Sequence, residues 1–210
     1  MSTELTAEQA RIVALVYVAS LVPLGVVATQ WFRGRLPRWI AAIYVATFLC
    51  CALGWELWFT YGWVDGAAVD ARRFPALNVW IPLHLNWLLN SLGDAGVVGL
   101  GGILLVHFAH RKRAVDPFDS WRWSTFAVLL VWFLAQNLWI ELRVYYAQLA
   151  PGFNLSWAPL APTGKFFNPV LFELGGRTVQ LQTQLPWLLM TPIFYALALR
   201  LRKRFGDKMC

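Results

Sequence analysis

Five long apolar stretches constrain this chain more than any other feature of its sequence. They cover residues 11–31, 39–61, 81–108, 122–147 and 184–204. A helix of roughly 20 residues is enough to cross the hydrocarbon core of a bilayer. Only 14% of the 210 residues are charged, whereas soluble domains carry about 25%. The sequence therefore predicts an all-α integral membrane protein with about five transmembrane helices, in which residues 1–210 form a single membrane domain.

Basic residues are distributed unevenly between the two faces that these spans define. With an external N-terminus, the inner segments hold 12 of the 18 Lys and Arg residues and the outer segments hold five, while Arg143 lies near the outer end of the fourth span. Cytoplasmic loops carry an excess of Lys and Arg, so the asymmetry predicts an N-outside, C-inside orientation. It also explains the net charge of +7 without a nucleic-acid partner. His107 and His110 lie among the inner basic residues, and we expect them at a solvated or lipid-headgroup surface.

The two long connections, residues 62–80 and 148–183, are outer loops in this orientation. In the second loop, the alternating stretches Val170–Leu174 and Thr178–Gln182 flank Gly175-Gly176-Arg177, a pattern that predicts a small extramembrane β-hairpin near 170–182. Long ordered loops often carry binding functions, so we expect the function on the outer face. We predict a multi-pass protein of a bacterial-type inner or cell membrane.

Polar residues within the spans are concentrated in the second, third and fourth of them. The second span contains Glu56. The third contains Asn86, Asn90 and Asp94, and the fourth contains Asn137, Glu141 and Tyr145, each series with a spacing of four residues. At 1.5 Å per residue, Glu56 and Glu141 lie roughly 8–9 Å below the outer ends of their spans. Ionisable groups inside a membrane are costly and usually functional. We predict one pocket between these three helices; the alternative is that the polar groups only bond neighbouring helices.

Aromatic residues surround Glu56 in the sequence, namely Trp55, Trp58, Phe59 and Tyr61. An aromatic wall can stabilise a cation, and a buried carboxyl group tends to keep its proton. The combination suits an acid that protonates an alkene or an epoxide. Trp and Tyr also gather at membrane interfaces without a catalytic role, so an aromatic belt is the alternative interpretation.

Histidine and cysteine offer little for metal or redox chemistry. A metal site can be written from His84, Glu56, Asp94 and Glu141, but no HxxxH or ExxH spacing supports it. The three cysteines include no CxxC pair. We therefore expect neither a metal nor a cofactor.

Two short segments carry a family resemblance. Residues 54–61 read GWELWFTY and residues 87–98 read WLLNSLGDAGVV. They resemble the Trp-Glu element and the following acidic helix of the small integral-membrane terpene cyclases of meroterpenoid pathways. In that family, carboxylates protonate the terminal epoxide or alkene of a prenyl chain, and aromatic residues shelter the carbocation. The resemblance implies that Glu56 is the acid or its partner and that Asp94 is a supporting acid.

We therefore predict a membrane-embedded enzyme that acts on a lipid-soluble, isoprenoid substrate by cofactor-free acid catalysis. The expected catalytic residues are Glu56, Asp94 and Glu141, with Glu141 in an electrostatic role. The expected substrate-binding residues are Trp55, Trp58, Phe59, Tyr61, Asn86, Asn90, Asn137 and Tyr145.

Two other classes of function remain open at this stage. One is a non-catalytic lipid-binding protein or accessory subunit of a membrane complex, and the other is a transporter or ion-path component. The expected partners are membrane lipid and a hydrophobic small molecule, with a homo-oligomer or a larger membrane complex as further alternatives and no nucleic acid.

Overall fold

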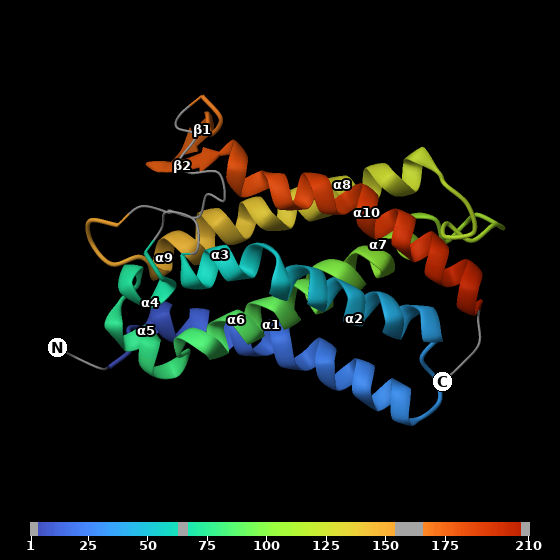
Figure 1. The fold of residues 1–210 in the computed structure, drawn as a ribbon, viewed down its shortest axis with the longest axis horizontal. Coiled ribbons are helices and arrows are strands. Elements are labelled where there is room, and N and C mark those ends of the chain that lie inside the picture. The colour runs from blue at the N-terminus through green and yellow to red at the C-terminus, as the bar shows by residue number, and fades with distance from the viewer. Residues whose placement is uncertain (1–3, 63–66, 154–165, 207–210) are drawn as a thin grey trace.

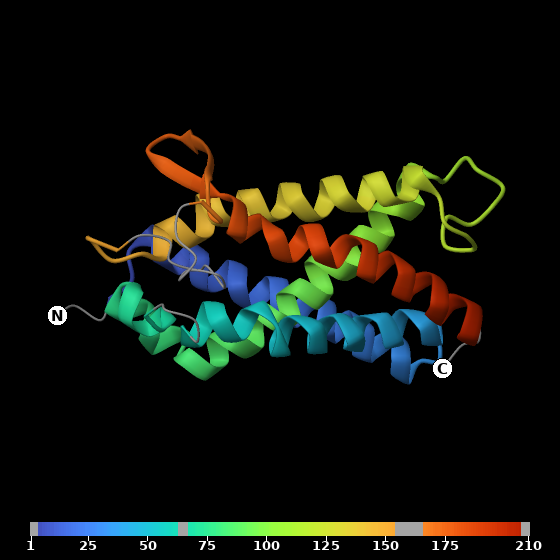
Figure 2. The same ribbon diagram turned by 45° about the horizontal axis from the view of Figure 1, so that its top comes forward.

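The described part of the chain folds into lengthwise helical segments that lie side by side (Figures 1 and 2). The structure is a computed structural model and describes residues 4–62, 67–153 and 166–206. The first segment is α1 (Ala7–Phe32), and the second joins α2 (Arg38–Leu53) to α3 (Trp55–Tyr61). The third runs through α6 (Leu83–Gly93), the π-helix η1 (Asp94–Leu100) and α7 (Gly101–Ala109). The fourth runs through α8 (Trp123–Ile140), the π-helix η2 (Glu141–Tyr145) and α9 (Tyr146–Gln148), and the fifth is α10 (Leu181–Phe205).

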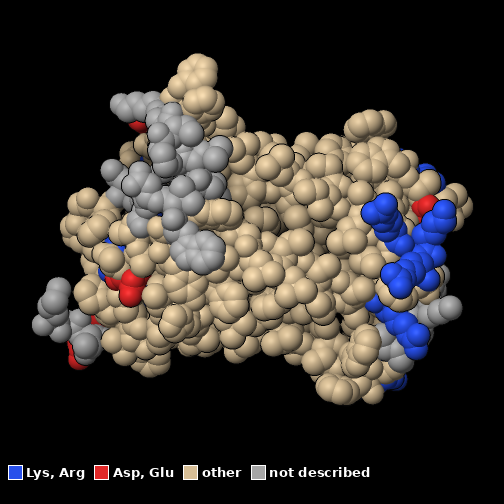
Figure 3. Space-filling model, in the orientation of Figure 1, with Lys and Arg blue, Asp and Glu red and all other residues tan. Residues whose placement is uncertain are grey.

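The two ends of the bundle differ in structure and in charge. One end, called the hairpin end, carries α4 (Val69–Arg72), α5 (Pro75–Trp80) and a hairpin of β1 (Val170–Leu174) and β2 (Arg177–Gln180). The opposite end, called the basic end, carries the connections 33–37 and 110–122 and the end of α10. Figure 3 shows Lys and Arg gathered at the basic end, with a broad uncharged belt between the two ends on the visible face. Such a belt is the surface that a bilayer solvates.

Within the described residues, three helical segments are long and apolar enough to cross a membrane, namely α1, residues 83–109 and residues 123–148. The bent pair α2–α3 makes a fourth if it counts as one span. The prediction of a mostly helical protein with membrane-spanning helices is confirmed to that extent. The fifth predicted span corresponds to α10, which has 25 residues but starts with polar Gln182, Thr183 and Gln184 and ends in basic residues.

The predicted β-hairpin is present, and its strands end within two residues of the predicted bounds. β1 and β2 pair antiparallel, with a register irregularity between Val170 and Phe172. Gly175 and Gly176 form the turn with φ of +59° and +74°, a backbone conformation that glycine adopts at little steric cost.

The second predicted span, residues 39–61, is not the continuous helix that its apolar sequence predicts. It bends by 42° at Gly54, between α2 and α3. A Cβ atom at Gly54 would lie 2.5 Å from the carbonyl oxygen of Cys50, so the backbone here leaves no room for a side chain. Trp87 on α6 donates from Nε1 to the Ala52 carbonyl oxygen at 2.7 Å, just before the bend. The axis of α3, the helix that carries Glu56, therefore differs in direction from the axis of α2.

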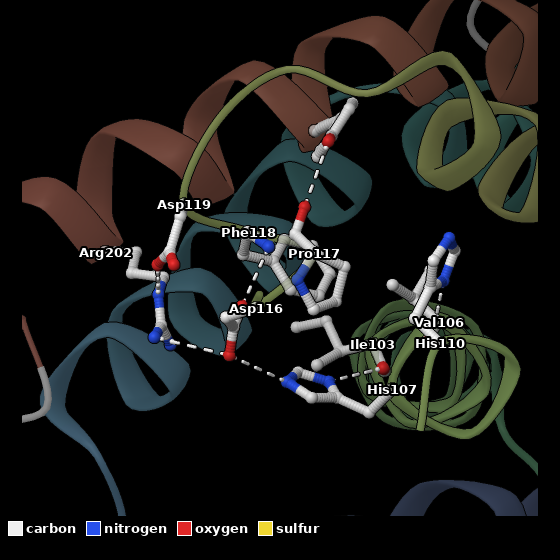
Figure 4. A network of polar contacts seen from close by, with 10 residues as sticks. Ile103, Val106, His107, His110, Asp116, Pro117, Phe118, Asp119 and Arg202 are labelled. Carbon is white, nitrogen blue, oxygen red and sulfur yellow. Dashed lines mark hydrogen bonds and ion pairs between the residues drawn. The ribbon is translucent and has the colours of Figure 1, made fainter. Parts of the chain in front are cut away.

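The main apolar core fills the basic half of the bundle. Ile43 of α2, Phe133 of α8, and Phe194 and Tyr195 of α10 are almost completely buried in it. At its edge, Arg202 forms ion pairs with Asp116 at 3.3 Å and Asp119 at 3.0 Å (Figure 4). These contacts fix the connection 110–122 against α10.

The two inner-loop histidines differ in exposure. His107 is half-exposed, and its Nε2 lies 3.5 Å from the Asp116 carboxylate. The expectation of a solvated surface is wrong for His110, which is buried with Nε2 3.1 Å from Ser124 Oγ. The reason is that the end of α7 packs against the start of α8.

Candidate functional site

Each of the three predicted catalytic carboxyl residues lies where a helix departs from regular α geometry. Glu56 is the second residue of α3, directly after the bend at Gly54. Asp94 is the first residue of η1, and Glu141 is the first residue of η2. Short π-helical segments within α-helices occur frequently at functional sites. The sequence singled out these three acids as candidates, but it did not predict the helix irregularities at which they lie.

One cavity brings the three carboxyl residues together. It is lined by residues from α1, α3, the third and fourth segments and α10. Its volume of about 120 Å³ is far larger than the roughly 10–15 Å³ that a single water needs. The predicted site residues on its wall are Trp55, Glu56, Phe59, Asn90, Asp94, Asn137, Glu141 and Tyr145. The cavity wall contains no Lys or Arg among the residues that the structure describes.

Glu56 and Asp94 are electrostatic neighbours within this cavity. Glu56 is 2% exposed, and its Oε2 has no hydrogen-bond partner within residues 4–62, 67–153 and 166–206. Asp94 accepts a hydrogen bond from Trp55 Nε1 at 3.0 Å, and the Cys51 thiol lies beside it. Asn90 lies beside Glu56. Asp94 is thus held by neighbouring side chains, while one oxygen of Glu56 is left without a protein partner.

Tyr145 occupies a central place among the acids. Its ring stacks on Phe59, with ring centroids 4.6 Å apart and an interplanar angle of 29°. The phenol lies within electrostatic range of Glu56, Asp94 and Glu141. With Trp55 and Trp187, whose ring centroids are 5.0 Å apart, these rings give the cavity an aromatic wall.

Glu141 is bound by residues that the sequence interpretation missed. Thr183 Oγ1 lies 3.1 and 3.0 Å from the two carboxyl oxygens of Glu141, within hydrogen-bond distance of both, and Gln184 donates from Nε2 to Oε2 at 2.5 Å. Asn137 donates from Nδ2 to the Thr183 carbonyl at 2.9 Å and to Gln184 Oε1 at 2.8 Å. The pocket was predicted between the second, third and fourth spans, but α10 and α1 also form its walls. The available signal was the polar run Gln182–Gln184 at the start of an apolar stretch.

Three predicted substrate-binding residues lie outside the cavity. Trp58 packs in a small cluster with Phe59 and Val69. Tyr61 lies at the end of α3, where its hydroxyl is 3.0 Å from His84 Nδ1. Asn86 is buried and donates from Nδ2 to Thr60 Oγ1 at 3.3 Å.

Two buried arginines from the 62–80 connection pack next to the cavity. Arg73 donates to Asn86 Oδ1 at 3.0 Å, to Asn78 and to the Ile81 carbonyl. Arg72 donates to the Phe59 carbonyl at 2.6 Å. Burial lowers the pKa of both guanidinium groups, that of Arg73 to about 10, so Arg73 remains charged at neutral pH. The Asn86 side chain is therefore engaged by Arg73, and this hydrogen bond attaches the 62–80 connection to α6.

The described residues contain no group of three or more His, Cys, Asp or Glu side chains that could hold a metal ion. His84 pairs with Tyr61 rather than joining the acids, so the four residues from which a metal site could be written do not form one cluster. Comparison of the chain with family models, with curated proteins and with solved structures found no match.

Proposed function

We propose that this protein is a membrane-embedded enzyme that rearranges a lipid-soluble, isoprenoid-type substrate by acid catalysis, in the manner of a terpene cyclase. The observation that carries the proposal is the Glu56 carboxyl group, buried in the cavity with Oε2 free of any protein partner among the described residues. A carboxyl group in such surroundings tends to keep its proton, and a free oxygen is available to a ligand.

The proposed reaction is a cyclisation that conserves the atoms of the substrate. Glu56 gives its proton to an epoxide oxygen, the carbon–oxygen bond breaks, and the electron pair of a neighbouring alkene forms the new carbon–carbon bond. The resulting carbocation loses a proton to a base in the cavity. Asp94 and Glu141 stabilise the positive charge electrostatically, and Phe59 and Trp55 do so through their ring faces.

The composition of the cavity wall supports a hydrophobic substrate that becomes cationic. Leu15, Val16, Val98 and Ile140 provide apolar contacts, and Asp94 and Glu141 line the same cavity as the proposed acid Glu56. Val97 lines the cavity and its side chain is exposed, and we propose that the substrate enters sideways from the lipid.

The experiment is an assay of the purified protein with prenyl epoxides, with product analysis for cyclised isomers of the same mass. Glu56→Gln removes the proton but keeps the shape, so turnover should fall by about 10²–10⁴-fold, the usual contribution of a general acid. Glu8→Gln, at an exposed position in the first turn of α1, is the matched control and should keep full activity. Unchanged turnover in Glu56→Gln would remove Glu56 from the mechanism.

A lipid-binding protein is the second candidate, because the same cavity suits a lipid that is held without reaction. It predicts that isoprenoid lipid co-purifies with the protein, that no cyclised product forms, and that Glu56→Gln changes affinity alone.

We also propose that the bundle crosses the membrane five times, with α10 as the fifth span and the hairpin end outside. The basic end carries most of the Lys and Arg residues, and α1 begins and α10 ends at opposite ends of the bundle (Figure 1). Reporter fusions at the two termini of the chain, in a bacterial inner membrane, test this proposal. Reporters on the same side of the membrane would contradict it.

A further inference from the structure

The β1 strand and the two residues Phe166 and Phe167 form an exposed apolar surface at the hairpin end, called the hairpin surface. Phe166 is 86% exposed and Leu174 is 60% exposed, and Val170, Leu171, Phe172 and Phe167 are also exposed. All five β1 residues are exposed, and Glu173 is the only charged residue in the strand. A hairpin in water normally buries one apolar face, but β1 buries neither.

The other strand of the hairpin is firmly attached to the bundle. Val179 of β2 is completely buried. Thr178 and Tyr146 exchange two hydrogen bonds, because the Tyr146 hydroxyl accepts from the Thr178 amide at 2.9 Å and donates to the Thr178 carbonyl at 2.7 Å. Because β2 is attached to the bundle and pairs with β1, the exposed β1 strand is held in a fixed position.

The position of the hairpin relative to the bundle identifies what covers it. Figures 1 and 2 show the hairpin rising from the side of the bundle beside the start of α10, rather than extending along the helix axes. Residues Trp139 of α8, and Leu189 and Ile193 of α10, are exposed apolar side chains of the neighbouring lengthwise segments. These side chains face lipid once the bundle lies in a membrane, and the hairpin then stands beside the lipid-facing side of α10 (Figure 1).

Backbone chemistry sets the depth at which the hairpin can lie. A two-stranded sheet has unpaired amide and carbonyl groups along its edges, and such groups do not lie in the hydrocarbon core exposed to lipid. The headgroup layer supplies water for these groups and apolar contact for the side chains.

We propose that the hairpin surface lies in the headgroup layer of the membrane beside the bundle and binds lipid there. β2 leads directly into α10, where Thr183 Oγ1 lies within hydrogen-bond distance of both the Gln180 carbonyl oxygen, at 2.7 Å, and the Glu141 carboxyl group. The lipid contact therefore holds the end of α10 that supports Glu141. This inference requires that the bundle lies in a membrane, but it does not depend on the proposed reaction.

The test places an environment-sensitive fluorophore on single cysteines in the full chain. The background is Cys50→Ser with Cys210→Ser, in which Cys51 is retained because it is buried. Phe172→Cys and Leu174→Cys are labelled in phosphatidylcholine vesicles that contain some phosphatidylglycerol. Leu104→Cys, in the exposed apolar middle of α7, serves as the hydrocarbon reference, and Lys112→Cys in the basic connection serves as the water reference. The unmodified background, treated in the same way, gives the signal from Cys51.

We expect emission maxima at positions 172 and 174 between those of the two references. Lipids brominated near the headgroup should quench both labels more strongly than lipids brominated near the chain ends. Emission equal to that of the Lys112→Cys label, with no quenching, would place the strand in water and overturn the proposal. Energy transfer between labelled copies that disappears on dilution with lipid would assign the surface to a second copy and would also overturn it. A hydrocarbon-like signal at Leu104→Cys in the same vesicles shows that the bundle itself is inserted.

Discussion

Gly54→Ala is the substitution whose effect follows most directly from the geometry. The added Cβ would lie 2.5 Å from the Cys50 carbonyl oxygen, and a backbone oxygen cannot rotate away as a side chain can. The bend between α2 and α3 must therefore change, and Glu56, two residues later, must move with it. Overpacking of this kind costs about 1–3 kcal/mol.

That cost can be measured as a loss of thermal stability in detergent. At about 2–4 °C per kcal/mol for a protein of this size, Gly54→Ala should lower Tm by roughly 2–12 °C. Gly25→Ala in α1 is the matched control, because nothing lies within 4 Å of its added Cβ. Alanine is the better helix former by up to about 1 kcal/mol, so the control should be neutral or stabilising.

The position of Glu56 provides a second measurement on the same variant. If the bend sets that position, Gly54→Ala should also lose cyclisation activity at temperatures well below its Tm. A Gly54→Ala protein with the Tm of Gly25→Ala and full activity would refute the argument that the bend is required.

Two further substitutions test the packing around the cavity. Gly96→Ala would place a Cβ 2.4 Å from Pro23 Cβ, so it should separate η1 from α1 and lower Tm by an amount similar to Gly54→Ala; a Tm equal to that of Gly25→Ala would contradict this. Asn137→Ala removes the hydrogen bonds to Thr183 and Gln184 and should cost about 1–3 kcal/mol, since buried partners are left unpaired. Gln136→Ala, which loses only a bond to Phe133 in its own helix, is the control, and an equal fall in Tm for both would show that the contact to α10 is not the cause.

Much of the fold followed from hydropathy and from the Gly-Gly turn, because both are local properties of the sequence. Lipid-facing helices need long apolar runs wherever they lie, and Gly175-Gly176 needs only its own backbone freedom. The bend at Gly54 is not encoded in this way. The bent backbone brings the Cys50 carbonyl so close to Gly54 that a side chain would not fit, yet Gly54 lies in an apolar run that reads as a continuous helix.

The candidate site was predictable in part for the same reason. Four-residue spacing placed Asn90 with Asp94, and Asn137 with Glu141, on shared helix faces, and these four residues do line the cavity. The same spacing failed for Asn86, because Arg73 from the 62–80 connection binds it. Nothing in the sequence near Asn86 indicates that an arginine from a separate connection will be buried beside it.

The π-helical turns have a consequence for the rotational phase of the helices that carry the acids. A π turn accommodates residues beyond the α-helical number, and each residue corresponds to about 100° of rotation about the helix axis. η1 therefore separates the phase of α6, which directs Asn90 toward the cavity, from that of α7, which directs Ile103 into the core. Deleting one residue between Asp94 and Leu100 would force the two halves into a single phase, so that a change of length there would be more damaging than most changes of side chain.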